Sequence, residues 1–451
     1  MAGRSLINVL LNKNKLKQRF NLFRNRNFRL LWFGSLVAMM GDFFLFVGMP
    51  FLIMNLTEDR ATIGGVLAVA GIPRALLLLF GGALSDRFSP LLMMKVSRVA
   101  FMLLLLLMTT LILNESISIA GLYVFSGLMG VIGAFGMPAS MAILPLLVKR
   151  EELAPANAIT GSTSQLISAL APALVGIAVL YLSTEPFKAI LLGSWPAIED
   201  LPRRADMQGI GLAYAIDVLL IIVSMIPLWL IKLETEPKQP NQTDSIMTSI
   251  QDGFSYVWQD ASLRAFIIYM TITTFVSMGP QMVGMPVLAD DNLNGMRSFG
   301  VLMSAQGLGA VFGSLLAAFA TPAASLLGPV VMTLAIVRGF GTLLIAAITS
   351  DQQGILLMTT MGILTGYSSI VFMTWVQKRV SLEYIGRVMS LVMLAVMGLQ
   401  PLSQGFSGWF IDFAGVTTLF ISIGFFMIIT PFFALLSADI RNMGEPRKSQ
   451  Q

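Results

Sequence analysis

Two residues of opposite charge lie inside long apolar runs of this sequence. Asp42 follows Arg29 by thirteen residues and Arg74 precedes Asp86 by twelve, so each lies about 18–20 Å along its run if the runs are helices. A charge at the bilayer centre costs about 2.5–3.5 kcal/mol on the mildest scale and needs a partner or water. Matching depth predicts an Asp42–Arg74 pair facing a central cavity. Either Asp42 accepts a proton under the control of Arg74, or the two form a permanent ion pair.

Other chemistry is limited by what the sequence lacks. It has no cysteine and no histidine, which removes thiolate and imidazole metal ligands and the side chain best suited to titrate near neutral pH. We therefore expect no metal site, no cofactor and no membrane-embedded enzyme, and we expect any proton-handling group to be a carboxylate. Asp217 and Arg338 also lie in apolar runs, and we expect structural roles for both.

The elements that carry these charges are long enough to cross a membrane. Of the 451 residues, 56% are hydrophobic and 12% are charged, whereas soluble domains carry about 25% charged residues. A spanning helix needs about 20 apolar residues. Twelve such runs lie near residues 28–55, 63–84, 96–113, 119–147, 156–182, 209–231, 264–288, 298–320, 326–348, 354–376, 386–411 and 415–437. The runs are continuous rather than alternating, which predicts an all-α membrane protein with twelve transmembrane helices.

Charge and polarity predict how these helices are arranged. Lysine and arginine gather in alternate connections, so both termini are expected to be cytoplasmic, in the bacterial inner (plasma) membrane. The net charge of +5 therefore indicates topology rather than nucleic-acid binding. The predicted units are a basic N-terminal segment (1–27), a six-helix bundle (28–231), a cytoplasmic linker with an amphipathic helix (232–262), a second six-helix bundle (263–438) and a cytoplasmic tail (439–451). We expect residues 184–207 to form an external surface insertion or a cap.

The two halves repeat each other. Phe80-Gly81-Gly82 is matched by Phe312-Gly313-Ser314 at the corresponding place in the second half, and a duplicated six-helix unit is a recurring transporter plan, with the substrate site near the midplane. Gly81 and Gly82 permit close helix packing and lead into a charged turn, Asp86-Arg87, predicted to act as a gating loop. Pro172 and Gly176 are expected to bend the fifth helix.

With this layout, the chain resembles the major facilitator superfamily over nearly its whole length. Gly81-Gly82-Ala-Leu-Ser-Asp86-Arg87 is similar to the loop signature of that superfamily, and Ala171-Pro172-Ala-Leu-Val-Gly176 is similar to its antiporter motif, with alanine in place of the leading glycine. Gly136-Met-Pro138-Ala-Ser and the residues after it resemble the bacterial branch that exports macrolides and enterobactin. The resemblance implies alternating access, with Asp86 latching the two halves against a helix N-terminus.

The resemblance also implies a set of cavity helices. Adaptable pockets for amphipathic molecules use aromatic and methionine surface with a few amides. The candidate cavity residues are Phe43, Gln165, Gln281, Gln306, Tyr367, Trp375, Gln400 and Gln404.

These observations predict a secondary transporter that exports an amphipathic small molecule, such as a drug, a siderophore or a lysolipid, in exchange for protons. The sequence has no Gly-rich phosphate loop of the ATP-binding type. The expected partners are the substrate, the coupling proton and membrane lipids, without nucleic acid, and the expected state is a monomer. Import or lipid flipping by the same fold is the alternative, and a non-transporting receptor or scaffold is a more remote one.

Overall fold

The computed structural model describes residues 22–87, 89–183, 202, 205–233, 246–319, 322, 326–381, 384–436, 438–441 and 443. The side chains of residues 78–87, 246–250, 318–319 and 393–396 are outside this description, as are those of 150, 154, 385, 386, 390, 438 and 439. Most of the basic N-terminal segment, the external segment 184–207 and the C-terminal tail therefore lie outside the described residues.

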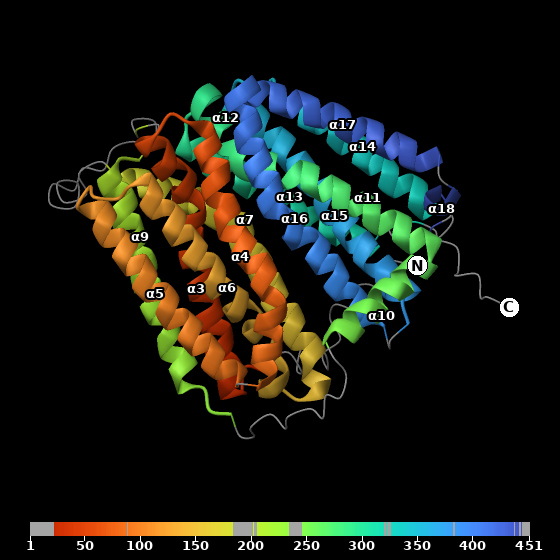
Figure 1. Ribbon diagram of the computed structural model, residues 1–451, viewed down its shortest axis with the longest axis horizontal. Coiled ribbons are helices and arrows are strands. Elements are labelled where there is room, and N and C mark those ends of the chain that lie inside the picture. Colours follow the sequence, from red (N-terminus) through yellow and green to blue (C-terminus); the bar gives the residue numbers. More distant parts are fainter. Residues whose placement is uncertain are drawn as a thin grey trace.

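Every element in the described residues is a helix (Figure 1). The first half contains α3 (Arg26–Leu56), α4 (Arg60–Arg87), α5 (Pro90–Leu113), α6 (Ile119–Leu147), η1 (Arg150–Glu152), α7 (Leu153–Leu182) and α9 (Met207–Leu230). A linker helix, α10 (Ile246–Gln259), leads to the second half. That half contains α11 (Ala261–Gly279), η3 (Pro280–Gly284), α12 (Met285–Asn292), α13 (Met296–Phe319), α14 (Leu327–Ile345), α15 (Asp351–Arg379), α16 (Ile385–Ala414), α17 (Val416–Leu436) and α18 (Ala438–Arg441).

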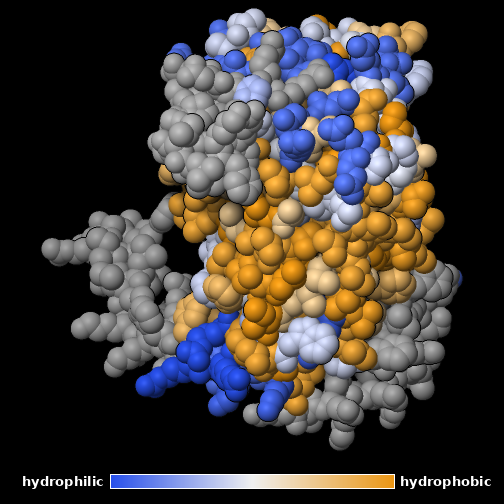
Figure 2. Space-filling model, turned by 90° about the vertical axis from the view of Figure 1, so that its left-hand side faces the viewer, coloured by the Kyte–Doolittle hydropathy of each residue, from blue (hydrophilic) through white to orange (hydrophobic). Residues whose placement is uncertain are grey.

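These helices confirm the predicted all-α fold of twelve spans in two bundles. The seventh span is α11, η3 and α12 together, because Pro280 has no N–H to continue the α-helical ladder and the chain makes one π-helical turn there. Figure 2 shows a hydrophobic band between hydrophilic ends on the face that it presents, as expected for a surface in contact with lipid. Below, the linker side is the end of the bundles that carries α10, and the far side is the opposite end.

Short polar residues begin many of these helices. The side chain of Asn25 accepts hydrogen bonds from the backbone N–H groups of Asn27 and Phe28, at 3.0 and 3.2 Å. Ser118, Asp206, Asp260 and Ser350 cap α6, α9, α11 and α15 in the same way. Each cap satisfies an N–H group that has no partner within its helix, which fixes where the span begins.

The connection between α4 and α5 differs from the predicted charged turn. Asp86 and Arg87 belong to the last turn of α4, and α5 begins at Pro90. Proline fits the first turn of a helix and cannot continue the preceding one, so the connection is confined to residues 88 and 89. The backbone of Gly81 and Gly82 is helical, and the side chains of Asp86 and Arg87 lie outside the described residues.

A strip of glycines brings α3 and α9 together. Gly34, Gly41 and Gly48 recur every seven residues along α3 and face α9. A Cβ atom on Gly34 would lie 3.0 Å from the carbonyl oxygen of Ser224, and one on Gly48 would lie 3.0 Å from the Tyr214 ring. Because small residues let helix backbones approach closely in a membrane, this strip fixes the distance and register of the pair.

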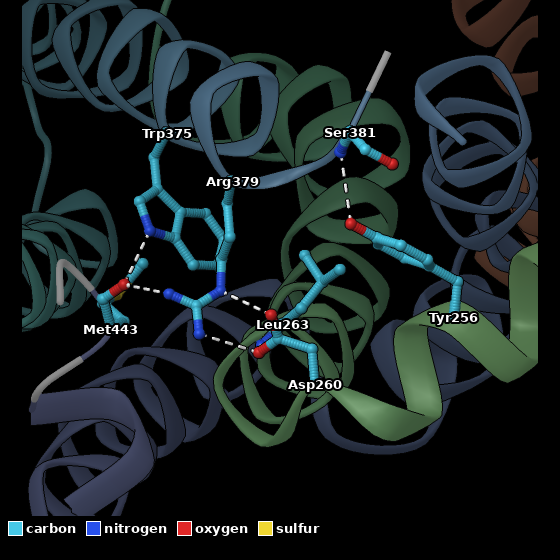
Figure 3. Close-up of polar contacts among 7 residues, drawn as sticks. All are labelled: Tyr256, Asp260, Leu263, Trp375, Arg379, Ser381 and Met443. Atoms are coloured by element: carbon cyan, nitrogen blue, oxygen red, sulfur yellow. Dashed lines mark hydrogen bonds and ion pairs between the residues drawn. The ribbon is translucent and has the colours of Figure 1, made fainter. Parts of the chain in front are cut away.

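The linker helix is fastened to the second half. Asp260, which follows α10, forms a bidentate ion pair with Arg379 of α15, at 2.8 and 2.9 Å. Arg379 and the indole N–H of Trp375 also donate to the carbonyl oxygen of Met443, at 2.9 and 2.8 Å (Figure 3). The hydroxyl of Tyr256 accepts a hydrogen bond from the backbone N–H of Ser381. Helix α10 therefore belongs structurally to the second bundle.

We expect Arg379→Gln to destabilise the second bundle by about 3–5 kcal/mol, because the carboxylate of Asp260 would be left buried without its charged partner. The side chains of this pair are only 10% and 2% exposed. The control is Arg387→Gln, because the Arg387–Asp252 pair is 29% and 53% exposed and such pairs contribute at most about 1 kcal/mol. Thermal unfolding of the purified variants in detergent measures the loss of stability caused by each substitution. Equal losses would show that the buried Arg379–Asp260 pair stabilises the bundle no more than the exposed pair does.

Candidate transport site

The two bundles meet through backbone contacts between α7 and α13. Gly300 of α13 lies against the carbonyl oxygen of Pro172, and Gly307 lies against the backbone of Ala169. A Cβ atom on Gly176 would lie 3.1 Å from the carbonyl oxygen of Met296. These residues extend from the middle of α7 toward its end and from the start of α13 to its middle, so this contact occupies the far-side half of the spans.

Helices α4 and α16 make the equivalent contact across the other edge of the bundles. Gly64 of α4 lies against the backbone of Gly408, and Gly71 lies against the ring of Pro401. Since α4 begins on the far side and α16 ends there, this contact is also in the far-side half. All the close glycine contacts between bundles in the described chain lie at this end.

A hydrogen bond between the bundles lies next to Pro172. The backbone N–H of Ala173, one residue after the proline, donates to the hydroxyl of Ser304 on α13 at 2.8 Å. A helix can be opened at a proline, where a backbone group is free to find a side-chain partner. Pro172 and Gly176, predicted as the bend of the fifth helix, thus lie at the contact between bundles.

An ion pair joins the two bundles at the surface of the far side. Arg60, at the start of α4, lies 3.0 Å from Asp291 and 3.8 Å from Asp290 at the end of α12. Sequence analysis did not select these residues, because each lies in a short polar connection that resembles any other span boundary. Their pairing depends on how the two bundles are docked.

On the linker side the same helix faces are open. Asn157, Gly161 and Gln165 of α7 are exposed, although they continue the helix face that contacts α13 at Ala169 and Gly176. No atom outside its own helix lies within 4 Å of a Cβ atom built on Gly161. The bundles therefore close against each other on the far side and separate toward the linker side (Figure 1).

Asp42 and Arg74 are both exposed although they lie in the middle of their spans. The charge of each acts on the other, and Asp42 also interacts with Arg98 of α5. Among the described residues, no direct ion pair joins Asp42 to Arg74. An exposed charge at mid-depth needs water, so these side chains are best accommodated facing the opening between the bundles.

Arg98 is a charged residue of the site that sequence analysis missed. The only sequence signal for Arg98 is its distance from the start of the third span. The predicted third span began at residue 96 and placed Arg98 at the membrane edge, whereas α5 begins at Pro90 and carries Arg98 about 12 Å along the helix. The longer helix brings Arg98 within electrostatic reach of both Asp42 and Asp217.

The remaining candidate residues separate into two groups. Gln165 is exposed, and Phe43, Gln281, Gln306, Tyr367 and Gln400 are partly exposed. Within this group, Gln281 of η3 donates to the side-chain oxygen of Gln306 on α13 at 2.6 Å, which joins two helices of the second bundle. Trp375 and Gln404 are only 5% and 6% exposed, so the structure places neither at an open surface in this conformation.

An apolar cavity of about 420 Å³ lies elsewhere, among α11, α16 and α17 of the second bundle. Phe275, Phe406, Phe410 and Phe426 line it. Phe406 and Phe426 are also exposed, so the cavity opens to the outside of the bundle. It is separate from the charged side chains of the first bundle.

Comparison with known proteins agrees with this architecture. The family model of the Major Facilitator Superfamily matches residues 31–403. The chain belongs to this superfamily. Within it, the chain is 23% identical over 369 residues to the enterobactin exporter EntS of Escherichia coli O81 (strain ED1a), covering 80% of this chain and 79% of EntS.

Two solved structures show the same fold. The nucleoside transporter NupG superposes with a TM-score of 0.65 at 14% identity, covering 91% of this chain and 98% of NupG. A D-xylose–proton symporter superposes with a TM-score of 0.60 at 13% identity, covering 95% and 99% of the two chains. This superfamily member is thus a multi-pass membrane transporter, and the family indicates a transport rather than an enzymatic function.

We expect Gly300→Ala to open the far side. Its new Cβ atom would collide with the backbone carbonyl of Pro172, which cannot move aside as a flexible side chain does. Because the sequence has no cysteine, spin labels on Glu58→Cys and Asn292→Cys report the far-side distance between bundles. That distance should lengthen in most molecules carrying Gly300→Ala.

The matched control is Gly405→Ala, on the α16 face that contacts α4. A Cβ atom there would lie 3.5 Å from Ala68, which is ordinary van der Waals contact. This variant should keep the wild-type distance. An unchanged distance in Gly300→Ala would show that the α7–α13 contact does not hold the far side closed.

Proposed function

We propose that this superfamily member is a proton-coupled exporter of an amphipathic small organic molecule, working by alternating access. The proposal is supported by the close contact of the bundles on the far side and by the exposure of Asp42 and Arg74 at mid-depth, which an opening between the bundles would supply with water. A transporter of this plan holds its substrate near the membrane midplane between the two repeats. The similarity to an enterobactin exporter supports export.

Orientation supports the direction of transport. The lysines and arginines of the connections concentrate on the side that carries α10, as in cytoplasmic segments. We propose that this linker side is cytoplasmic and contains both termini, with the chain in the bacterial inner membrane. The conformation described here is then open to the cytoplasm, where an exporter loads its substrate.

Asp42 is proposed as the group that couples substrate to proton. Its carboxylate lies within electrostatic reach of Arg74 and Arg98, so both cations respond to a change in its charge. A proton entering from the far side in the opposite conformation would neutralise Asp42. Reopening to the linker side would release that proton and restore the charge before the next substrate binds.

The residues at the end of α4 are proposed to close the linker side in the opposite conformation. Asp86 and Arg87 lie in the last turn of α4, and α16 begins on the same side of the membrane. An anionic side chain at a helix N-terminus is stabilised by about 0.3–2 kcal/mol. Such a contact is weak enough to break in each cycle.

The substrate is proposed to bind among aromatic, methionine and amide side chains. Phe43, Gln165, Tyr367 and Gln400 are wholly or partly exposed, and such surfaces adapt to amphipathic molecules. Drugs, siderophores and lysolipids share this chemistry. We propose a monomer in contact with membrane lipids as the working unit.

Import by the same fold is the second candidate, because a D-xylose–proton symporter shares this architecture. Lipid flipping is a related outcome. Accumulation of a substrate measured with and without an uncoupler, in cells with a known pH gradient, separates import from export. An exporter accumulates less substrate when the gradient is intact, whereas an importer accumulates more.

The decisive test is flux in proteoliposomes against a panel of siderophores, macrolides and lysolipids, with an imposed pH gradient. Asp42→Asn should abolish gradient-driven transport and retain exchange of substrate down its own gradient, because the amide cannot carry the proton. Asp252→Asn is the control, since this exposed carboxylate lies on α10 and should leave flux unchanged. Undiminished gradient-driven flux in Asp42→Asn would remove Asp42 from the mechanism.

A further inference from the structure

Asp217 of α9 is an enclosed carboxyl group in the first bundle. The residue is 0% exposed, and among the described residues neither of its side-chain oxygens has a hydrogen-bond partner. Gly41 of α3 lies directly against one of these oxygens, so closely that a Cβ atom at that position would collide with it. The glycine strip thus brings the backbone of α3 against the carboxyl group of Asp217. The next residue of α3, Asp42, is exposed on another face of the helix.

The chemistry of this pocket disfavours a charge. An ionised carboxylate needs hydrogen-bond donors, and burial without them costs far more than burial of the neutral acid. The nearest polar group on its own helix, the hydroxyl of Tyr214, is likewise buried and has no hydrogen-bond partner in the part of the chain that the structure describes. Asp217 therefore has the surroundings of a protonated acid, unlike Asp42, which is exposed.

Charged groups approach Asp217 from two other helices. Asp42 on α3 and Arg98 on α5 both act on its carboxyl group, and Tyr214 interacts with it from α9. Helix α7 also packs against α9, and among the described residues it contributes no charged group to these interactions. Because Arg98 acts on Asp42 as well, one guanidinium links the exposed and the buried carboxyl groups.

A small crevice with three polar lining residues lies on the linker side of this group, between α3, α5 and α9. It has a volume of about 20 Å³, and Ser35, Arg98 and Ser224 contribute its polar lining. A space of this size holds one water molecule when polar partners are present. Ser224 is two turns of α9 closer to the linker side than Asp217, so the crevice extends from the level of Arg98 toward that side.

We propose that Asp217 holds a proton in this conformation and exchanges it with the linker side through the crevice lined by Ser35, Arg98 and Ser224. The proton then moves between α3, α5 and α9, inside the first bundle, while the substrate moves through the opening between the two bundles. Asp42 and Asp217 form a two-carboxyl relay across α3, with Arg98 responding to the charge of both. The role of this relay in coupling rests on the proposed function, whereas the protonation of Asp217 does not.

Infrared spectroscopy of the purified protein tests the protonation without any substrate. At neutral pH the wild type should show the carbonyl-stretch band of a protonated carboxyl group. Asp217→Asn should remove this band and Asp42→Asn should retain it. If Asp217→Asn does not fold, Asp217→Glu keeps the acid and should shift the band. A wild type without the band, or a band unchanged in both Asp217 variants, would overturn the proposal.

The route is tested by transfer of the same protein into D2O. The rate at which the carboxyl band shifts reports how fast the proton of Asp217 exchanges with solvent. Ser35→Leu fills the crevice and should slow this exchange several-fold, and Ser224→Val provides an independent obstruction. Asp42→Asn, on another face of α3, should slow it less. A rate reduced only by Asp42→Asn would overturn the separate route and place the proton path in the substrate opening.

These outcomes are distinguishable from failure of the proposed function. If none of the tested substrates shows pH-driven flux but the infrared band is assigned to Asp217, then Asp217 is protonated as proposed and the proposal of proton-coupled export is wrong. If pH-driven flux is found and the band does not belong to Asp217, then export is proton-coupled through Asp42 and Asp217 has no part in it.

Discussion

The structure depends on close backbone contact between the two bundles at one end. Gly300 and Gly307 meet the backbone of α7, and Gly64 and Gly71 meet α16. In a membrane, apolar side chains gain little from leaving lipid for another helix, so helix association relies on close packing and on hydrogen bonds. Here the glycines allow the helix backbones to pack closely, and the hydrogen bond from Ala173 to Ser304 also joins the two bundles. Contacts of this kind close fully or not at all, which suits a transporter that alternates between two states.

The charged groups within the membrane differ between the two bundles. In the described spans of the first bundle, Asp42, Arg74, Arg98 and Asp217 interact with one another. In the second bundle, Arg338 interacts with Tyr269, and its Nε atom is buried without a partner. The interiors of the two bundles are thus chemically different. The charged groups proposed to handle protons belong to the first bundle, and the linker helix is bonded to the second.

Much of the fold was predictable because lipid imposes simple rules. Continuous apolar runs gave twelve spans and polar connections gave two halves, and the fold confirms both. The α4–α5 connection was predicted less well, because the charged residues Asp86 and Arg87 suggested a turn, whereas Pro90 determines where the next helix begins. The break at Pro280 was missed because the apolar run continues through it.

The site was harder to predict because it depends on distances between helices. Depth counting placed Asp42 and Arg74 at the same level, but it cannot indicate which face of a helix is exposed. Arg98 was missed through an error of six residues in one boundary. Asp217 was expected to have a structural role, and its close approach to Gly41 becomes visible only when α3 and α9 are packed. Trp375 was selected by its type, and its indole is instead bonded to Met443.

If the two bundles move against each other as rigid bodies, one side opens when the other closes. Two label pairs in the otherwise cysteine-free chain test it: Glu58→Cys with Asn292→Cys on the far side, and Glu151→Cys with Lys378→Cys on the linker side. Distance distributions for each pair, recorded in lipid across a range of pH, should show two populations. We expect the linker-side distance to shorten in the same fraction of molecules in which the far-side distance lengthens. Distances that stay fixed, or that lengthen together on both sides, would contradict it.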